Sequence, residues 1–465
     1  MFLLRAVSFL LACLPEFAAR GLTAVLAEIV FWCIPRRRRP VLSNLSHAFP
    51  DKPHRWLVCM GRRSFRRMIE TGLLALIYPQ LERARIQKMV TADGSLLNSI
   101  STLVNSGRAS VLAIPHLGAW DFCSAIPLLY SGKLPHLGAI YRRLRNRNLD
   151  DWVRGARERF GVRMLSRKAG FNEGMQILRR GGALGILFDQ NARDSGALSL
   201  LFGRVCSTTN LPGLLAEKFA ANLAIFFTRR LGFWRYELAI RIEENMPREA
   251  DAITAGLDRW LEETLRSDEE LSSTWLWVHN RWKTQVEPRA RFRLDHKRSI
   301  LPAGTKLPRA TRFFVRLPDL PEAAREALPF LAALRESRPD AALTALAPGA
   351  FAETARASGV FEEVIPLPDG KLARLALARR LRRRYPDCWI VLADDGWSAL
   401  EARFSACPQR FGFARPGQRG FGLTDTCEVA ASTGRSDFEA FFRHFGMREK
   451  LASTCESSSL RHLPS

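Results

Sequence analysis

The amino-acid sequence predicts an α/β protein with two domains and a membrane-associated amino-terminal helix. From Ser110 onward, short apolar runs alternate with helical stretches of about 10–15 residues, which is typical of an α/β sheet. A second alternation of the same kind begins after a stretch rich in Pro, Arg and Lys at residues 285–308. Residues 1–35 are mostly apolar and are followed directly by four arginines, which is typical of a membrane-associated segment.

The composition indicates folded domains and an anionic partner. The 465 residues allow two or three domains, and a hydrophobic content of 47% excludes a wholly disordered chain. Lys and Arg outnumber Asp and Glu by 70 to 46, so the net charge is +24. Such a charge predicts nucleic acid, a phospholipid surface or a phosphorylated substrate as partner. The arginine clusters, which could equally be solvated helix faces, are Arg36–Arg39, Arg62–Arg67, Arg142–Arg147 and Arg379–Arg384.

The cysteines predict a reducing compartment. Nine cysteines are spread along the chain with no CxxC pair and no spacing typical of a zinc site. We therefore expect neither structural disulfides nor a metal ion, and nothing in the sequence calls for a cofactor.

Residues 1–35 predict an amphipathic anchor that lies in the plane of the membrane. Neither of the two apolar runs, FLLRAVSFLLACLP and GLTAVLAEIVFWCIP, reaches the roughly 20 residues needed to span a bilayer. No cleavage site for a signal peptide follows them. Trp32 and Arg36–Arg39 suit the headgroup level, and if the segment inserts into the membrane instead, the arginines would keep the rest of the chain on the cytoplasmic side. The alternative is a helix packed on the core.

The first domain is expected over residues 41–284. A helical pattern from Val41 to about Leu81 precedes the alternating region, and a last helix is expected from about Asp251 to Leu265. The expected strands between them are SVLAIP, LPHLGAIYR, VRMLSR, ALGILFDQ, NLAIFFTRRL and RYELAIRIE. The helices expected among these strands are NLDDWVRGARERFG and NEGMQILRRGG.

A smaller α/β domain of Rossmann type is expected over residues 309–430. Its expected strands are TRFFVRLPDL, AALTALA, FEEVIPL and CWIVLADD. Two to three βαβ turns in about 120 residues correspond to one half of a Rossmann fold. Residues 285–308 show no periodicity and predict a linker, and residues 431–465 predict a poorly patterned tail.

The stretch IPHLGAWD, residues 114–121, contains the first candidate catalytic pair. On a continuous helix His116 and Asp121 would lie some 140° apart, because five positions turn the chain by about 500°. The two can pair if His116 ends a strand, Gly118 permits a turn and Asp121 begins the next helix. A histidine oriented by a carboxylate can deprotonate a hydroxyl, which then attacks an acyl group. The alternative is that these residues only end a strand.

Several motifs in a fixed order resemble those of a known family. Besides IPHLGAWD they are NLSHAFPD (44–51), YRRLRN (141–146), GALGILFDQ (182–190), LFG (201–203) and WVHNRWK (277–283). Together they are similar to the late acyltransferases of lipid A biosynthesis, a branch of the lysophospholipid acyltransferase superfamily, over roughly residues 1–285. The resemblance implies an acyltransferase-type αβ sandwich. Leu201 stands where the family commonly has a phenylalanine, so the acyl chain length stays open.

The resemblance implies roles for particular side chains. His116 would be the general base, and Asp121 would orient it. The substrate-binding candidates are Arg142, Arg167, Asp189 and Gln190. Arginines suit a phosphorylated sugar-lipid because the guanidinium group binds phosphate with two hydrogen bonds. Asp189 could instead anchor an arginine, and His279 is expected to pack under an aromatic cluster.

The reaction implied is transfer of an acyl group from a thioester to a hydroxyl of a lipid A-type precursor or a related anionic lipid. The resemblance implies that acyl carrier protein carries this thioester. The expected location is the cytoplasmic face of the inner membrane. Acyl carrier protein is acidic, so the basic chain should attract it, and salt should weaken the attraction. The alternatives are acylation of a phospholipid or an aminoacyl lipid, and a non-catalytic basic membrane-binding protein. No nucleic-acid fold signature is present, so no nucleic-acid partner is expected.

Residues ~309–424 resemble, more weakly, the amino-terminal half of the heptosyltransferases that build the lipopolysaccharide core. The similar stretches are VRLPDL, VFEEVIPLP, RRYPDCWIVLAD and PQRFGF. The family's catalytic aspartate would be Asp319, but Pro318 replaces the glycine expected before it. In that family the nucleotide-sugar site lies in the carboxyl-terminal half, which these residues do not resemble. This domain is therefore expected to bind a sugar-lipid without transferring a sugar, and a plain α/β interaction module is the alternative.

Overall fold

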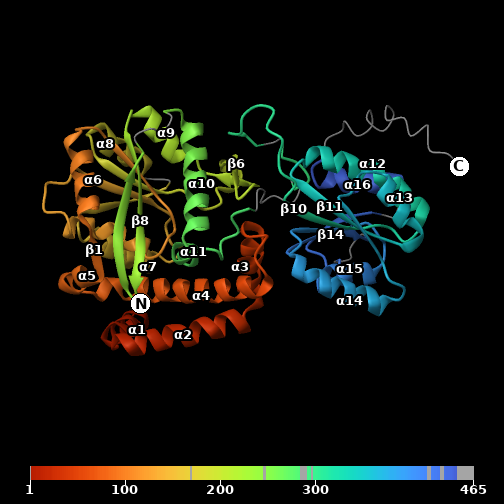
Figure 1. The fold of residues 1–465 in the computed structure, drawn as a ribbon, viewed down its shortest axis with the longest axis horizontal. Helices are drawn as coiled ribbons and strands as arrows, with labels where there is room; N and C mark the ends of the chain where they lie inside the picture. The colour runs from red at the N-terminus through yellow and green to blue at the C-terminus, as the bar shows by residue number, and fades with distance from the viewer. Residues whose placement is uncertain are drawn as a thin grey trace. The chain divides into compact units, whose positions relative to one another are not determined.

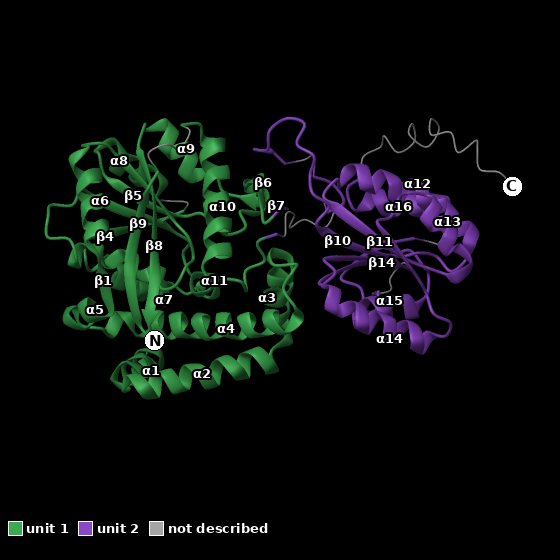
Figure 2. Ribbon diagram, viewed as in Figure 1, with its two compact units in different colours: residues 1–202, 206–281 green, residues 203–205, 282–465 purple. Residues whose placement is uncertain are grey.

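The computed structural model (Figure 1) describes residues 2–167, 170–243, 248–282, 291–294, 297–415, 420–429 and 434–447. The chain forms two compact units, coloured separately in Figure 2. Unit 1 comprises residues 1–202 and 206–281, and unit 2 comprises residues 203–205 and 282–465. Each unit contains a largely parallel sheet with helices, as the alternation of strands and helices predicted.

Unit 1 is built on a seven-stranded sheet with the order β1-β9-β8-β2-β5-β3-β4. The strands are β1 (Val90–Ala92), β2 (Ser110–Ile114), β3 (Leu137–Tyr141), β4 (Val162–Ser166), β5 (Ala183–Leu187), β8 (Asn222–Gly232) and β9 (Arg235–Ile242). Within this sheet the β8–β9 hairpin is antiparallel, and the other neighbouring pairs are parallel. The central strands β2 and β5 pair Ile114 with Leu187, so the residues after these positions emerge side by side.

Helices cover both faces of this sheet, with α9 and α10 side by side in Figure 1. The helices are α4 (His54–Ile77), α5 (Arg83–Met89), α6 (Gly94–Asn105), α7 (Arg147–Glu158), α8 (Phe171–Arg179), α9 (Leu211–Lys218), α10 (Ala250–Ser267) and α11 (Glu269–Thr274). A 3₁₀ helix, η2 (Trp120–Leu128), follows β2. The short strands β6 (Ala197–Leu201) and β7 (Arg204–Thr208) form a sheet of their own.

Three helices precede this body: α1 (Phe2–Cys13), α2 (Glu16–Cys33) and α3 (Pro35–Ala48). Helix α2 lies along α4 on the side away from the sheet (Figure 1). It buries one stripe of residues spaced by four, namely Ala19, Thr23, Ala27 and Phe31. Glu28 fixes α2 to α4 through Arg62 and Arg66, at 3.0 and 2.8 Å. Within the described residues no single helix is long and apolar enough to cross a membrane. Helices α1 and α2 satisfy that test only as a pair, with a 120° bend between them.

Unit 2 is a six-stranded parallel sheet with the order β12-β11-β10-β13-β14-β15. Its strands are β10 (Thr311–Arg316), β11 (Ala341–Ala347), β12 (Glu363–Pro366), β13 (Cys388–Val391), β14 (Gln409–Ala414) and β15 (Asp425–Glu428). Its helices are α12 (Pro321–Ser337), α13 (Ala352–Ala357), α14 (Lys371–Leu381), α15 (Gly396–Phe404) and α16 (Arg435–His444). This is the complete 3-2-1-4-5-6 order of a doubly wound sheet, whereas the sequence predicted one half of it.

The ends of unit 2 also differ from the prediction. Phe292, in the predicted linker, is fully buried in the core of unit 2. Helix α16, in the predicted tail, buries Phe438, Phe441 and Phe442 in the same core. A single aromatic side chain such as Phe292 carries no period. Helix α16 does show helical spacing in Phe438, Phe441 and Phe442, which Phe445 continues, and the sequence prediction missed it. The rest of the predicted linker and tail includes residues 285–290, 295–296, 431–433 and 448–465, which lie outside the described residues.

Candidate active site

His116 lies two residues beyond β2, at the carboxyl edge of the unit 1 sheet. Gly118 follows it with φ +55°, in the left-handed region that favours glycine. A Cβ at this position would lie 2.6 Å from Oγ1 of Thr228, so the turn also lacks room for a side chain. Asp121 lies in the first turn of η2. The strand end, the turn and the helix start predicted around His116 are therefore all present.

The imidazole of His116 is paired with Asp189. Nδ1 of His116 lies 2.6 Å from Oδ1 of Asp189, and the backbone N–H of His116 donates to Oδ2 at 2.8 Å. Asp189 lies two residues beyond β5, just as His116 lies two residues beyond β2. Because β2 and β5 are parallel neighbours with Ile114 opposite Leu187, their register brings the two residues together. Nε1 of Trp275 donates a further hydrogen bond to Oδ2 of Asp189, at 2.7 Å.

Asp189 is buried yet ionised. Burial alone would raise its pKa, but the interaction with His116 and the hydrogen bonds from His116 and Trp275 outweigh that cost, so the pKa of Asp189 lies below its usual range. An ionised carboxylate only accepts hydrogen bonds, so Nδ1 of His116 carries the proton. Nε2 of His116 then carries no proton and can accept a hydrogen bond, and the side-chain amide of Gln190 donates to it at 2.9 Å.

The predicted pair of His116 with Asp121 is not formed. Asp121 instead binds Arg157 of α7, whose Nη2 and Nε lie 2.6 and 2.7 Å from Oδ1. The five-residue spacing was misleading because the register of the parallel strands places the carboxylate of Asp189, 73 residues away in sequence, against the imidazole of His116. Arg157 then neutralises the carboxylate that follows the Gly118 turn.

A cavity of about 310 Å³ opens beside the dyad. Its polar end is lined by His116, Trp120, Asp121, Arg142, Arg157 and Gln190. Its apolar wall includes Leu112, Leu137, Ile140, Val153, Leu187 and Phe226. A smaller hollow of about 70 Å³ shares Leu112, Leu137 and Phe226 with it, so the apolar wall continues along the sheet away from His116. Such a cavity suits an extended hydrocarbon chain with its polar end at the dyad.

No protein nucleophile is hydrogen-bonded to His116 among the described residues. Cys123 lines the cavity, but burial raises the pKa of its thiol far above the ordinary value, so it is not a thiolate. Ser124 donates its hydroxyl hydrogen bond to the carbonyl of Asp121 at 2.7 Å. The geometry therefore favours deprotonation of a substrate hydroxyl over formation of an acyl-enzyme.

The remaining predicted site residues divide into two groups. Arg142 lies at the cavity, is exposed, and forms no hydrogen bond or ion pair with the part of the chain that the structure describes. Arg167 is exposed, donates to Oγ of Ser195 at 3.2 Å and does not line the cavity. The structure thus gathers His116, Asp189, Gln190 and Arg142 at one site and leaves Arg167 outside it.

Sequence reasoning missed Trp275 and the hydrogen bond of His279. Nε2 of His279 accepts from the backbone N–H of Asn191 at 2.8 Å. Burial lowers the pKa of His279 to about 4, so this imidazole is neutral near pH 7 and can accept. His279 was expected only to pack under aromatic side chains. The signal that could have found this contact was the motif itself, WVHNRWK, whose polar residues stand between tryptophans.

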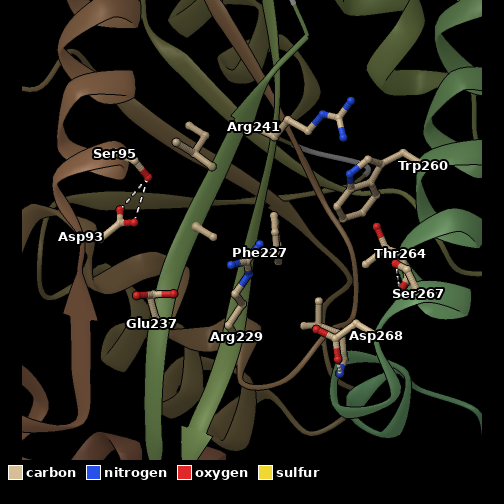
Figure 3. A pocket seen from close by; sticks show the side chains of 13 residues that line it. Asp93, Ser95, Phe227, Arg229, Glu237, Arg241, Trp260, Thr264, Ser267 and Asp268 are labelled. Atoms are coloured by element: carbon tan, nitrogen blue, oxygen red, sulfur yellow. Dashed lines mark hydrogen bonds between the residues drawn. The ribbon is translucent and has the colours of Figure 1, made fainter.

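A second groove, of about 290 Å³, lies on the opposite face of the sheet between α10 and the β8–β9 hairpin (Figure 3). Phe226 lines the cavity beside His116 and Phe227 lines this groove, since successive strand residues point to opposite faces. Arg229, Glu237 and Trp260 also point into the groove (Figure 3). No histidine or cysteine belongs to its described lining, so we place the candidate chemistry at His116.

In unit 2, Asp319 is held by two arginines. Nη2 of Arg316 lies 2.9 and 3.0 Å from its two carboxylate oxygens, and Nη1 of Arg374 lies 3.1 Å from Oδ1. Arg316 is fully buried, and its Nε donates to Glu401 at 3.0 Å. The aspartate predicted to correspond to the family's catalytic aspartate is thus an ion-pair partner here.

The site is a buried His–Asp pair beside an apolar cavity at the carboxyl edge of an α/β sheet, an arrangement that suits acyl chemistry. The chain belongs to the bacterial lipid A biosynthesis acyltransferase family, whose model matches residues 1–284. No curated protein matched the chain. Family membership confirms the predicted recognition of the first domain and assigns the chain to acyl transfer in lipid A synthesis.

Three of the solved structures that match part of the chain are described as glycosyltransferases. The glycosyl transferase family 9 protein from Veillonella parvula is 16% identical, and the match covers 31% of this chain and 44% of that one, with a TM-score of 0.28. The ADP-heptose lipopolysaccharide heptosyltransferase II of E. coli is 19% identical, with coverages of 33% and 46% and a TM-score of 0.26. E. coli heptosyltransferase WaaC with ADP is 16% identical, and the match covers 33% of this chain and 50% of that one, with a TM-score of 0.25. The chain spans about half the length of each of these structures or less. They are the kind of enzyme that residues ~309–424 were predicted to resemble.

Proposed function

We propose that the chain transfers a fatty acyl group from the thioester of acyl carrier protein to a hydroxyl of a lipid A-type precursor. The observation that carries this proposal is the His116–Asp189 dyad at the polar end of an apolar cavity. The cavity would take the acyl chain and leave the thioester carbon beside Nε2 of His116. Membership of the lipid A acyltransferase family supports the same reaction and the class of acceptor.

In the proposed reaction His116 is the general base. Its Nε2 takes the proton of the acceptor hydroxyl while the hydroxyl oxygen forms a bond to the thioester carbon. Asp189 stabilises the imidazolium that results. The tetrahedral intermediate then breaks its C–S bond, and the imidazolium returns the proton to the sulfur. The products are an ester and a free thiol, so protons and electron pairs balance.

Gln190 occupies the position that the acceptor hydroxyl must take. Its amide donates to Nε2 of His116 at 2.9 Å in the structure, and one lone pair accepts one donor at a time. The acceptor hydroxyl would therefore displace the amide of Gln190. The exposed Arg142 at the cavity, followed by three further exposed arginines in residues 143–147, would bind the phosphates of the acceptor.

The proposal is tested by the mass spectrum of total lipid A from cells that express the chain. We expect a gain of one acyl chain with the wild-type protein and no gain with His116→Ala, because the general base is lost. The mass gained also identifies the acyl chain length. The matched control is His136→Ala, since His136 is exposed, immediately precedes β3 and does not line the cavity.

An equal gain with His116→Ala and wild type would overturn the role of the dyad. No gain with either, while both proteins are folded and present at the membrane, would overturn the lipid A-type acceptor. The same cells would then be examined for acylated phospholipid and aminoacyl lipid.

We infer that α1 and α2 dock in the plane of the cytoplasmic face of the inner membrane. The face of these helices turned away from α4 exposes large apolar side chains, including Phe2, Phe9, Phe17 and Trp32 at 88, 58, 80 and 52% exposure. Arginines 36–39 begin α3 directly after this face and would meet anionic headgroups.

Replacing Phe9 and Phe17 together with Glu should lower binding to phosphatidylglycerol vesicles by more than about 10-fold, because each buried Phe contributes roughly 1.5–3 kcal/mol. Co-sedimentation with vesicles measures this. The control is Leu214→Glu, which puts the same charge on an exposed leucine of α9. Unchanged binding of the double variant would show that another surface holds the protein to lipid.

A further inference from the structure

We propose that Asn44 is a positioning residue for the acyl transfer. In this inference Asn44 holds the chain segment after α11, and Trp275 and His279 of that segment hold the loop that carries Asp189 and Gln190. The inference rests on the function proposed above for the His116 site. Asn44 belongs to the motif NLSHAFPD, which supplies no residue to the cavity beside His116.

A series of three sets of hydrogen bonds, or links, connects Asn44 with the dyad, and the side-chain amide of Asn44 makes the first link. Its Nδ2 donates to the carbonyl of Trp277 at 2.8 Å and to the carbonyl of His279 at 2.9 Å, so both amide protons are used. Asn44 is 5% exposed, and its neighbours Leu45 and Ala48 on α3 are fully buried. The donor is therefore held by a packed helix that is more than 230 residues away in sequence from the carbonyls it binds.

The second link joins this segment to the catalytic loop. Nε2 of His279 accepts from the backbone N–H of Asn191 at 2.8 Å, and Nδ2 of Asn191 donates to the carbonyl of Asn280 at 3.1 Å. Asn191 directly follows Gln190 in the chain. The two contacts thus fix both the backbone and the side chain of the residue beside the amide that meets His116.

The third link acts on the carboxylate itself. Trp275 donates to Oδ2 of Asp189 at 2.7 Å, while Oδ1 of Asp189 faces Nδ1 of His116 at 2.6 Å. Neither Asn44, Trp275 nor His279 lines the cavity, so all three act through other residues. A displacement of about 1 Å at a reacting group can lower a rate by about 100-fold, so loss of the outermost anchor should be measurable in turnover.

The variant that isolates the proposed role is Asn44→Asp. It keeps the shape of the side chain, but a carboxylate donates no hydrogen bond and faces two carbonyl oxygens. The matched control is Ser8→Ala, since the buried hydroxyl of Ser8 also ties an amino-terminal helix, α1, to a distant carbonyl, that of Leu76, at 2.8 Å. Both variants remove a buried anchor of the amino-terminal helices, and only one of the two anchors leads to the catalytic loop.

Purified full-length variants are compared in kcat, KM and melting temperature with an acyl carrier protein thioester as donor. We expect Asn44→Asp to lower kcat by about 30- to 100-fold with KM within about 3-fold, and Ser8→Ala to keep kcat within about 2-fold. A second readout is the imidazole N–H proton of His116 in protein labelled with ¹⁵N-histidine. The wild-type signal from the hydrogen bond to Asp189 should be lost or shifted in Asn44→Asp and unchanged in Ser8→Ala.

Rescue by a conservative change tests the middle link. His279→Gln offers an amide oxygen to the N–H of Asn191, whereas His279→Leu offers no acceptor, so the glutamine variant should retain at least about 5-fold more kcat. A folded Asn44→Asp protein with wild-type kcat and an unchanged imidazole signal would overturn the proposal. If the wild-type protein shows no acyl transfer, the proposed function fails, and the imidazole signal still decides whether Asn44 positions the dyad.

Discussion

Replacing Asp189 with Asn should lower kcat by about 10³- to 10⁴-fold, a far larger effect than that of Asp121→Asn. The amide has no negative charge to stabilise the imidazolium of His116. It also cannot accept all the hydrogen bonds that the carboxylate now receives from His116 and Trp275, so the imidazole would be reoriented or take the other tautomer. Single-turnover transfer from the thioester measures the effect, and the melting temperature verifies that the variant is folded.

Asp121→Asn is the matched control for this prediction. Asp121 is also a carboxylate at the cavity, but its partner is Arg157, so we expect its loss to change kcat by less than about 10-fold. The reverse ranking, with Asp121→Asn severe and Asp189→Asn mild, would restore the pairing that the local sequence spacing suggested and would contradict the dyad described above.

Replacing Arg281 with Met should destabilise unit 1 by about 3–5 kcal/mol. Arg281 and Asp258 are both fully buried, and Nη2 of Arg281 lies 3.0 Å from Oδ1 of Asp258. The other oxygen of Asp258 accepts from the hydroxyls of Ser199 and Thr208, at 2.6 and 2.7 Å. Methionine fills similar space but leaves an uncompensated carboxylate in the interior. The melting transition of unit 1 should fall by about 6–15 °C.

The double variant Arg281→Met with Asp258→Leu is the control. Removing both charges should restore most of the lost stability, although Ser199 and Thr208 then lose their shared acceptor. A single Arg281→Met variant that melts within about 2 °C of wild type would show that the buried pair contributes little. Because the chain has two units, the transition is followed by tryptophan fluorescence and hydrogen exchange of unit 1 peptides.

Sequence patterns were sufficient for features that depend on neighbours in the chain. Alternation of apolar runs with helical stretches predicted both sheets, and the turn at Gly118 predicted where His116 would lie. The patterns were insufficient for β14 and β15, which complete the sheet of unit 2, and for Phe292, which joins its core. Strand β15 is four residues long with no continuous apolar run, and Phe292 is a single buried ring, so packing identifies them better than sequence pattern does.

The sequence by itself determined the family of the first domain, the strand end at His116 and the set of polar residues from which a site could be built. Tertiary structure decided which of them meet. Two carboxylates, Asp121 and Asp189, were available to His116, and the parallel register of β2 and β5 placed Asp189 against the imidazole while Arg157 bound Asp121. Spacing along one segment reports only local geometry, whereas the partner of a side chain at a sheet edge depends on which strand lies alongside.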